Sequence, residues 1–199
     1  STNIVFGLIW LHVAVQDVLI NTQCMMVYKK ALTEAMTMLA QHPDTLFIGQ
    51  NVIYGGQAMA STFVNIPMEK RIEFPVAEDF QLGYSTGLAL EGFIPVCIYP
   101  RFDFLLLASN QLINHLDKIP QMSALNPKVI IRTAVGSDRP LNPGPQHTQN
   151  HIAAFARMLH NVHIENLIDT ASILPAYERA LKRTGSTLLV EYGNLYNEK

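Results

Sequence analysis

The sequence predicts an α/β domain of the doubly wound kind, with a mainly parallel sheet and helices on both of its faces. Short apolar runs typical of buried strands alternate along the chain with longer segments whose apolar residues recur every three or four positions, as in helices. Strands that are apolar throughout and separated by helices are typical of parallel sheets built from right-handed crossovers. Hydrophobic residues make up 49% and charged residues only 15% of the chain, which fits a domain that is buried on several sides or hides surface in a complex.

The expected elements follow one another without a tandem repeat. A helix over 27–41 contains good helix formers and ends before Pro43, and a second helix, from about 79 to 91, is stopped by Gly92. The other expected helices are 104–119, 150–159 and 170–183. The expected strands are 45–49, 71–74, 93–99, 128–135, 162–166 and 186–192.

The carboxyl ends of the strands are where a ligand site is expected in such a sheet. Glu78, the turn over 100–104 and the Pro- and Gly-rich loop over 136–149 all follow predicted strands. The sequence therefore predicts that these three segments lie on the functional side of the sheet.

We expect residues 1–25 to form an apolar extension ahead of a domain that spans residues 26–199. The apolar stretch over 4–20 has no basic region before it and no cleavage site after it, which argues against a signal peptide. It is short for a membrane span and carries His12, Gln16 and Asp17. We expect it to be a helix or strand that packs on this protein or on a partner, with no membrane involved.

Charge and cysteine content exclude several classes of function. A net charge of -2 gives no electrostatic reason to expect nucleic acid as a partner. Cys24 and Cys97 match no metal spacing and predict buried thiols in a reducing compartment, so we expect a cytoplasmic location. The phosphate-binding glycine motifs GxxxxGK[ST] and GxGxxG and the CxxC motif do not occur.

The stretch RIEFPVAEDFQLGYSTGLALEG, residues 71–92, places Glu78 and Asp79 at the start of a helix. Acids at this position are favoured by the helix dipole and by capping, by roughly 0.3–1 kcal/mol, so a purely structural role is one interpretation. Gly83 and Gly87 indicate more, because a glycine inside a helix costs roughly 1 kcal/mol and suggests close approach by another backbone. Such packing, within the chain or across a subunit interface, would bury Glu78, and a buried carboxylate with no cation beside it can share a proton.

Residues 76–123, VAEDFQLGYSTGLALEGFIPVCIYPRFDFLLLASNQLINHLDKIPQMS, resemble the pyrimidine-binding domain of thiamine diphosphate enzymes. The likeness is strongest to the β subunit of the 2-oxo acid dehydrogenase E1 component. In that family a glutamate precedes a small-residue helix, a Gly-x-x-Pro strand, an aromatic turn and an Asp/Asn-Gln helix. KKALTEAM and TLFIGQNV near the start, PGPQHTQ in the long loop and DTASILPAYERALKRTGSTLLVEYGNLY near the end extend the resemblance to about residues 26–196.

The resemblance implies roles for five residues. Glu78 corresponds to the glutamate that hydrogen-bonds N1′ of the aminopyrimidine, where a shared proton favours the imino form that removes the thiazolium C2 proton. Phe104 corresponds to the aromatic residue stacked on the pyrimidine, with Phe102 as the alternative if the alignment shifts, and Val76 corresponds to a residue that lines the pyrimidine pocket. His147 corresponds to the loop histidine that faces the substrate. Core packing for Phe102 and Phe104, and an ordinary surface position for His147, are the alternatives.

Two departures from the family pattern bear on function. Gln50 and Asn51 stand where the family usually has acidic residues, which puts a proton relay through that position in doubt. The chain also stops where the family continues into a C-terminal transketolase-type domain, and it has no GDG…N sequence for magnesium and diphosphate, so no metal site is expected on this chain. The resemblance thus implies thiamine diphosphate as cofactor, with Mg²⁺ held by a diphosphate-binding, E1 α-like partner subunit, in a heterotetramer that contains a homodimer pair.

The function expected from the resemblance is decarboxylation of a 2-oxo acid and acyl transfer, by a subunit that is active only with its partner. Three alternatives remain open. The chain could belong to a transketolase-like enzyme that transfers ketol groups, or be a non-catalytic paralogue that assembles with a true enzyme. An unrelated nucleotide-binding α/β domain is disfavoured by the missing phosphate motifs.

Overall fold

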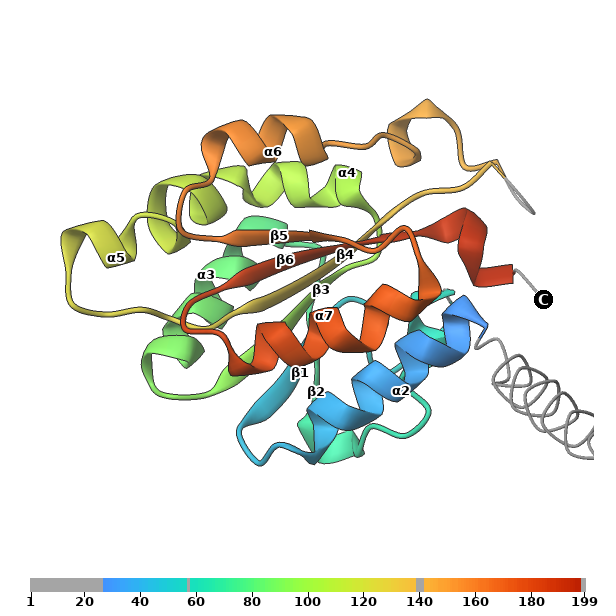
Figure 1. The fold of residues 1–199 in the computed structure, drawn as a ribbon, viewed down its shortest axis with the longest axis horizontal. Coiled ribbons are helices and arrows are strands. Elements are labelled where there is room, and N and C mark those ends of the chain that lie inside the picture. Colours follow the sequence, from blue (N-terminus) through green and yellow to red (C-terminus); the bar gives the residue numbers. More distant parts are fainter. Residues whose placement is uncertain (1–26, 57, 139–141, 198–199) are drawn as a thin grey trace, which may run out of the picture.

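A computed structural model describes residues 27–56, 58–138 and 142–197, and the extension expected over residues 1–25 lies outside them. Six strands form one sheet in the order β2–β1–β3–β4–β6–β5, and every pair of neighbouring strands is parallel (Figure 1). The predicted doubly wound α/β class is confirmed. The strands are β1 (Thr45–Gly49), β2 (Arg71–Glu73), β3 (Ile94–Tyr99), β4 (Ile130–Val135), β5 (His163–Asn166) and β6 (Thr187–Tyr192).

Helices cover both faces of the sheet (Figure 1). The α-helices are α2 (Tyr28–Gln41), α3 (Glu78–Leu90), α4 (Phe102–Leu105), α5 (Ile119–Met122), α6 (Ile152–Met158) and α7 (Thr170–Lys182). Short helical turns are η1 (Met59–Thr62), η2 (Met68–Lys70), η3 (Leu106–Ala108), η5 (Pro145–His147) and η6 (Gly193–Asn197), and η4 (Gln111–Leu116) is a π-helix. Most predicted elements are present, with ends that differ by at most two residues.

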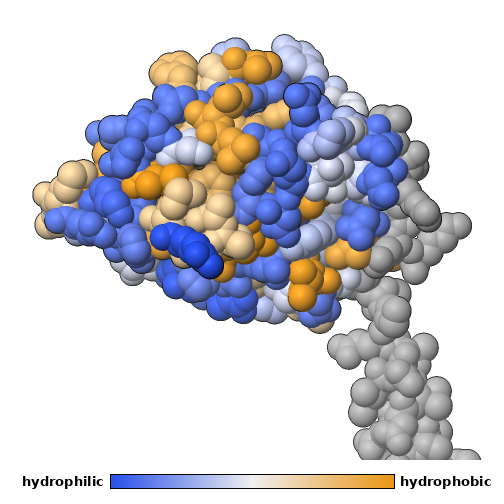
Figure 2. Space-filling model, turned by 90° about the horizontal axis from the view of Figure 1, so that it is seen from above, coloured by the Kyte–Doolittle hydropathy of each residue, from blue (hydrophilic) through white to orange (hydrophobic). Residues whose placement is uncertain are grey.

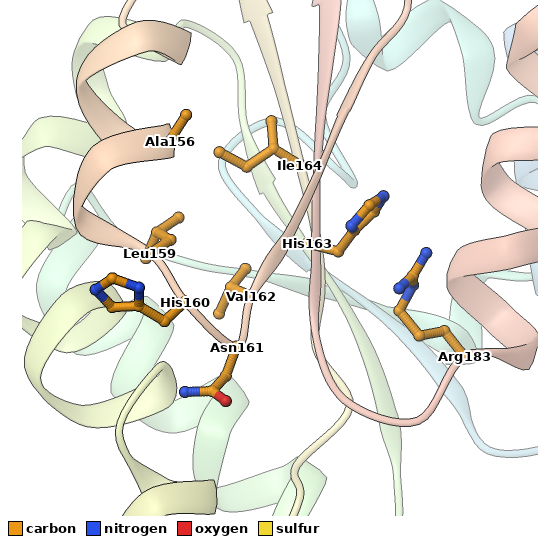
Figure 3. A pocket seen from close by; sticks show the side chains of 8 residues that line it. All are labelled: Ala156, Leu159, His160, Asn161, Val162, His163, Ile164 and Arg183. Carbon is orange, nitrogen blue, oxygen red and sulfur yellow. The ribbon is translucent and has the colours of Figure 1, made fainter.

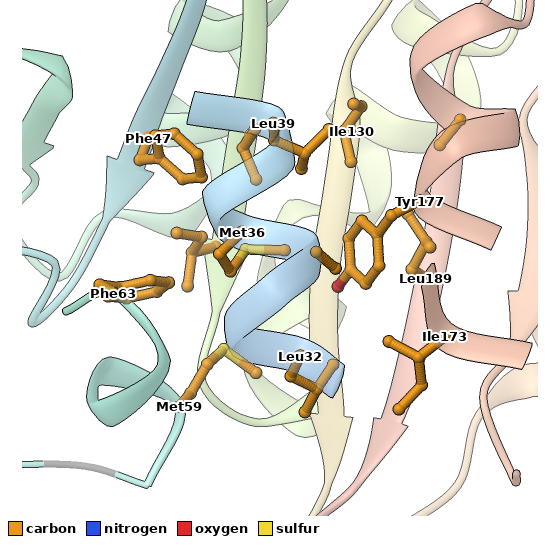
Figure 4. Close-up of a cluster of buried hydrophobic side chains, with 14 of the residues drawn as sticks. Leu32, Met36, Leu39, Phe47, Met59, Phe63, Ile130, Ile173, Tyr177 and Leu189 are labelled. Carbon is orange, nitrogen blue, oxygen red and sulfur yellow. The ribbon is translucent and has the colours of Figure 1, made fainter. Parts of the chain in front are cut away.

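The hydrophobic core has one cluster on each face of the sheet. On one face α2 lies between η1 and α7, so that Met36 and Leu39 pack among Phe47, Phe63 and Tyr177 (Figure 4). On the other face, Leu82 of α3 packs with Phe102, Leu112 and Phe155 over the middle strands. Each large apolar side chain buried in this way contributes about 1.5–3 kcal/mol, so these clusters hold the strand ends that carry the site.

The end of α3 has the capping pattern that its sequence predicts. Gly92 adopts a left-handed backbone, with φ +94°, which glycine tolerates without strain. The amide of Phe93 donates to the carbonyl of Leu88 at 3.1 Å, and the amide of Gly92 donates to the carbonyl of Ala89 at 3.3 Å. These two bonds form a Schellman motif, so Gly92 stops the helix as expected.

The single helix expected over 104–119 is wrong, because this segment is broken into α4, η3, the π-helix η4 and α5. In η4 the amide of Asp117 donates to the carbonyl of Leu112 at 3.0 Å, one residue further back than in an α-helix. The Asp117 carboxylate accepts from three backbone amides of the loop before β5, those of His160, Asn161 and Val162, at 2.7–3.0 Å. The widened turn thus lets Leu112 and Leu116 reach the core while Asp117 holds a distant loop.

A buried ion pair joins β4 to β6 on the face covered by α2 and α7. Arg132 donates to both carboxylate oxygens of Glu191, at 2.5 and 3.0 Å, and neither side chain has exposed surface. Tyr177 donates to Glu191 at 2.6 Å, Tyr196 also donates to it, and Arg132 donates to Thr62 at 2.9 Å. Although burial alone would lower the pKa of Arg132, the charge of Glu191 raises it, so the guanidinium stays charged.

Candidate functional site

The predicted site residues lie at the carboxyl ends of neighbouring strands. Gln50 follows β1, Glu78 follows β2, Phe104 follows β3, and His147 belongs to the loop after β4. The chain runs from β1 outward to β2 and then returns to the other side of β1 as β3. The segments after β1 and β3 therefore flank the topological switch point, where doubly wound sheets bind ligands.

Glu78 is the first residue of α3 and is only 6% exposed. Its Oε1 accepts a hydrogen bond from Nε2 of Gln50 at 3.1 Å. Among the described residues, Oε2 has no hydrogen bond, and no cation forms an ion pair with this carboxylate. The positive end of the helix dipole and one neutral amide are thus what stabilises a negative charge here, which leaves one oxygen free to bind a ligand.

Tyr99 fixes the backbone of Glu78 from the end of β3. Its hydroxyl donates to the Glu78 carbonyl at 2.9 Å. Burial raises the pKa of Tyr99 well above its ordinary value, so the hydroxyl keeps the proton that it donates. Gln81 of the same helix donates to the carbonyl of Ile98 at 3.0 Å, which joins α3 to β3 a second time.

Gln50 is held by a tight turn after β1. Asn51 has a positive φ of 60°, and its amide donates to Oε1 of Glu73 at 2.6 Å. The amide of Ile53 donates to the other oxygen of Glu73 at 2.9 Å. Glu73, at the end of β2, thus clamps the turn that aims Gln50 at Glu78.

Phe104 and His147 are in contact and line a small cavity together. Their ring centroids are 5.4 Å apart with the rings at 78°, an edge-to-face contact. The cavity has a volume of about 230 Å³ and is lined by Arg101, Phe104, Pro143 and His147. Nδ1 of His147 is buried and has no hydrogen-bond partner within the described part of the chain.

Gly136 sets the position of His147 at the end of β4. A Cβ at Gly136 would lie 1.7 Å from the carbonyl oxygen of His147 and 2.9 Å from its carbonyl carbon. Real Cβ atoms do not approach that closely, so only a residue without a side chain lets the loop return to the strand end here. This is a backbone constraint that brings His147 opposite Phe104.

The other two predicted contact residues lie apart from this cavity. Phe102 has no exposed surface and stacks on Phe155 of α6, with ring centroids 5.5 Å apart. Of the two aromatic residues, Phe104 therefore remains the candidate for contact with a ligand. Val76 is 78% exposed and contacts a ligand only if a partner covers it.

Asp103 and the residues around it were not predicted from the sequence. Asp103 is 9% exposed, and its Oδ1 accepts from Gln149 at 2.9 Å and lies 3.3 Å from Nε2 of His151. These contacts tie α4 to the segment just after His147. The signal that could have found them is an aspartate between two aromatic residues in an otherwise apolar segment.

The glycines of α3 do not meet another backbone within the described part of the chain, so the close packing inferred from them is not found there. A Cβ at Gly83 would lie 3.4 Å from the side chain of Gln111, and one at Gly87 would have no atom within 4 Å. The outer face of α3 instead exposes Phe80 and Tyr84, whose rings cluster with Phe74. Glu78 is buried by its own chain, and the glycine face of α3 is open to a partner.

The surface seen from above carries apolar side chains among hydrophilic ones (Figure 2). On the segments nearest this view, Leu107 is 64%, Leu106 44% and Met158 39% exposed. Together with Phe80, which is 64% exposed, they give the helices on this side of the sheet several uncovered apolar positions.

A second hollow, of about 360 Å³, lies near the amino end of β5. Leu159, Val162 and Ile164 lie on one side of the strand there, while His163 and Arg183 lie on the other (Figure 3). It is formed by the start of β5, the end of α6 and the residue after α7, and so lies at the opposite end of the sheet from Glu78 and His147.

The described residues offer neither a metal site nor a membrane span. No group of three or more His, Cys, Asp or Glu side chains in this part of the chain could hold a metal ion. Among the helices described, none is long and apolar enough to cross a bilayer. The chemistry of the site therefore depends on Glu78, on the Phe104–His147 cavity and on whatever these residues bind.

Comparison with known proteins identifies the family. A family model described as "Transketolase, pyrimidine binding domain" matches residues 25–198, nearly the whole chain. The chain belongs to this family. This pyrimidine-binding domain also resembles a solved structure titled "Split gene transketolase, inactive beta4 tetramer", with a TM-score of 0.65 over 83% of this chain and 51% of that one; at 19% identity this likeness shows the fold alone.

Two curated relatives are β subunits of pyruvate dehydrogenase E1. The domain is 26% identical to "Pyruvate dehydrogenase E1 component subunit beta" of Gracilaria tenuistipitata var. liui, over 175 residues, 85% of this chain and 53% of that protein. It is 28% identical to "Pyruvate dehydrogenase E1 component subunit beta-4, chloroplastic" of Oryza sativa subsp. japonica, over 181 residues, 85% of this chain and 43% of that protein. The chain spans about half the length of these relatives.

Proposed function

We propose that this chain is the pyrimidine-binding catalytic subunit of a split thiamine diphosphate-dependent enzyme that acts on a 2-oxo acid, in the manner of an E1 β subunit. The observation that carries the proposal is the Glu78 carboxylate, which is 6% exposed, begins a helix at a strand end, and is bonded to a neutral amide and not to a cation. Structural acids are usually exposed or paired with a cation, so this environment suits a carboxylate that exchanges a proton with a bound ring.

The residues present fit an aminopyrimidine. The free oxygen of Glu78 can accept a hydrogen bond from a ring nitrogen, and Gln50 holds the other oxygen in place. When bound, thiamine diphosphate supplies an acidic carbon whose deprotonation starts the reaction. Glu78 would hold and move the proton at the ring nitrogen, and Phe104 would offer an aromatic surface to the ring.

His147 is proposed to face the substrate, because it lines the cavity and its buried Nδ1 has no partner in the described chain. Gly136 and the contacts of Asp103 with Gln149 and His151 hold the loop that carries it. Val76 is proposed to line the pyrimidine pocket once a partner subunit covers its exposed surface.

The partner we propose is an E1 α-like subunit that holds Mg²⁺ and the diphosphate, since the described residues contain no group able to bind a metal. Phe80, Tyr84, the half-buried Gly83 and the exposed Gly87 of α3 form a face suited to a subunit contact, and we assign it to a C₂-symmetric pair within a heterotetramer. A cytoplasmic location remains a prediction.

A transketolase-like subunit is the second candidate function, favoured by the fold likeness to a split-gene transketolase. A non-catalytic paralogue is the third, favoured by Gln50, which cannot release a proton to Glu78 as an acid at that position could. Retention of a buried, unpaired Glu78 favours a catalytic chain over the third candidate.

The decisive experiment compares Glu78→Gln with Asp79→Asn in the complex reconstituted with the partner. Hydrogen–deuterium exchange at C2 of bound cofactor should slow by about 10²-fold in Glu78→Gln, the usual scale for loss of an acid–base group. Asp79 lies one position along the helix, turned by about 100°, and Asp79→Asn should change exchange little. Equal exchange in wild type and Glu78→Gln, with both variants folded, would return Glu78 to a structural role.

Two further measurements test the assembly. By calorimetry with thiamine diphosphate and Mg²⁺, we expect weak or no binding by the chain alone and firm binding by the complex; submicromolar binding by a demonstrated monomer would contradict the split site. Sedimentation of the mixture should give a species larger than a heterodimer. Sedimentation as monomers in the presence of the partner would count against the proposed interface.

A further inference from the structure

Arg101 has no role among those assigned so far, yet it lines the same cavity as two residues that do have assigned roles. It lies between the end of β3 and α4 and lines the 230 Å³ cavity together with Phe104, Pro143 and His147. Its guanidinium donates one hydrogen bond, of 3.3 Å, to the carbonyl of the neighbouring Pro100. No acidic residue within the described ranges forms an ion pair with it, so most of its five donors are free to bind a ligand.

His147 lines the same cavity and has an unsatisfied nitrogen of its own. Its Nδ1 is buried and has no partner in the described chain, and its ring rests edge-to-face on Phe104. A buried polar atom left without a partner costs about 1–3 kcal/mol, which a ligand in the cavity would recover.

The acids nearest in sequence do not neutralise this pair. Among the described residues that line the cavity there is no carboxylate. Asp103 directs Oδ1 to Gln149 and His151, at 2.9 and 3.3 Å, and Asp138 lines a separate hollow. The described lining of the cavity therefore combines the positive charge of Arg101 with the imidazole of His147.

We infer that Arg101 and His147 form a recognition site for the anionic group of the substrate, a carboxylate or a phosphate, held beside Phe104. The planar fork of a guanidinium matches both groups, which it can bind through two parallel hydrogen bonds. The volume is below the 300–1,000 Å³ typical of pockets for whole drug-sized ligands, so it suits one small charged group. That the anion belongs to the substrate rests on the proposed function; that the cavity binds an anion does not.

The two enzymatic candidates differ in the anion that they would present to this site. A 2-oxo acid carries a carboxylate beside its reacting carbonyl, whereas a ketose phosphate carries a phosphate. The preference of the Arg101–His147 site between the two anions thus indicates the substrate class of the chain.

The test uses the full chain, labelled in its histidine rings and observed by NMR, with the His147 signals assigned through His147→Gln. Pyruvate and inorganic phosphate are titrated separately at constant ionic strength. We expect one of them to shift the His147 signals saturably, and Arg101→Gln to weaken that binding about tenfold, the scale of one hydrogen bond to a charged group. Arg157→Gln is the matched control, because it removes an exposed arginine of α6 and should leave binding unchanged.

Tighter binding of pyruvate assigns a 2-oxo acid, and tighter binding of phosphate assigns a sugar phosphate. Arg101→Lys keeps the charge without the fork and should also weaken binding, which provides a second variant if Arg101→Gln does not fold. The inference is overturned if neither anion shifts His147 saturably, or if a folded Arg101 variant binds as tightly as Arg157→Gln.

Failure here is separable from failure of the proposed function. A complex that binds thiamine diphosphate while the chain shows no anion binding would overturn the anion site alone. A chain that binds the anion through Arg101 in a complex that does not bind the cofactor would overturn the proposed function and leave the anion site in place.

Discussion

Replacing Glu191 with glutamine removes one charge of the buried pair and leaves the positive charge of Arg132 with no exposed surface and no counter-charge. Glutamine has nearly the same size, so packing around Tyr177 and Tyr196 changes little. The perturbation is therefore electrostatic. It acts between β4 and β6, strands that are paired along six positions from Ile130 to Val135.

The expected loss of stability is large because no opposite charge would then offset the desolvation of the Arg132 guanidinium. Removing one partner of a buried ion pair typically costs about 3–5 kcal/mol, against a total stability of about 5–15 kcal/mol for a domain. Exposed pairs contribute about 0–1 kcal/mol. The pair between Arg179 and Glu165, with two bonds of 3.0 Å and an arginine side chain that is 51% exposed, provides a matched control in the same protein.

Urea unfolding at neutral pH measures the difference. With a slope of about 2 kcal/mol per molar urea, Glu191→Gln should lower the midpoint by roughly 1.5–2.5 M, and Glu165→Gln by at most about 0.5 M. The double variant Arg132→Met, Glu191→Leu should recover part of the loss, because apolar residues of similar volume remove the buried charge, while the hydroxyls of Tyr177 and Tyr196 lose their acceptor. A midpoint for Glu191→Gln no lower than that of Glu165→Gln would refute the reasoning.

Three further predictions follow from individual contacts. Gly136→Ala should displace the loop, because its Cβ would meet the His147 carbonyl at 1.7 Å, and should change the His147 ring signals by NMR; Gly87→Ala, which faces open space, should leave them unchanged. Burial alone would raise the pKa of Asp117, but the amides of Val162, Asn161 and His160 and the Lys118 ammonium lower it. The stability that Asp117 contributes is therefore present above its ordinary pKa of 3.8 and is lost as the pH falls through the lower pKa of the folded state. Urea midpoints measured from neutral to acidic pH should fall less steeply in Asp117→Asn than in wild type. Burial raises the pKa of the Cys97 thiol, which has no exposed surface, so in a Cys24→Ser background maleimide should label it in urea but not in the native chain; rapid native labelling would show that the core opens.

The sheet was predictable because its signal is local and repeated. Each strand is a short apolar run, and the alternation with helices fixes parallel pairing without any knowledge of contacts. Arg132 and Glu191 carried a signal that was not used: each is a single charge inside an apolar strand, which implies a buried partner. Their pairing depends on β4 lying beside β6, and this strand order cannot be read from the sequence.

The site was predictable in part. Glu78, Phe104 and His147 could each be predicted from a local motif that follows a single strand. The structure brings Phe104 and His147 into contact. The bond from Gln50 to Glu78 joins segments after different strands, so it depends on their relative position in the sheet and on a turn clamped by Glu73. The contacts of Asp103 with the loop depend on where that loop returns, which Gly136 decides.

The π-helix η4 has a consequence for how this domain tolerates changes in length. A π-turn holds one more residue than an α-turn, and in an α-helix one residue corresponds to a rotation of 100° and a rise of 1.5 Å. Gln111–Leu116 follows Phe104, which lies at the ligand cavity, and ends at Leu116, which is buried in the core. Because a π-turn and an α-turn each complete about one full rotation, deleting one residue from η4 would turn it into a regular helix and leave the two ends of the segment at nearly the same relative rotation. The widened turn thus absorbs the extra residue locally, and a chain one residue shorter within η4 would keep both its core and the contact of Phe104 with His147.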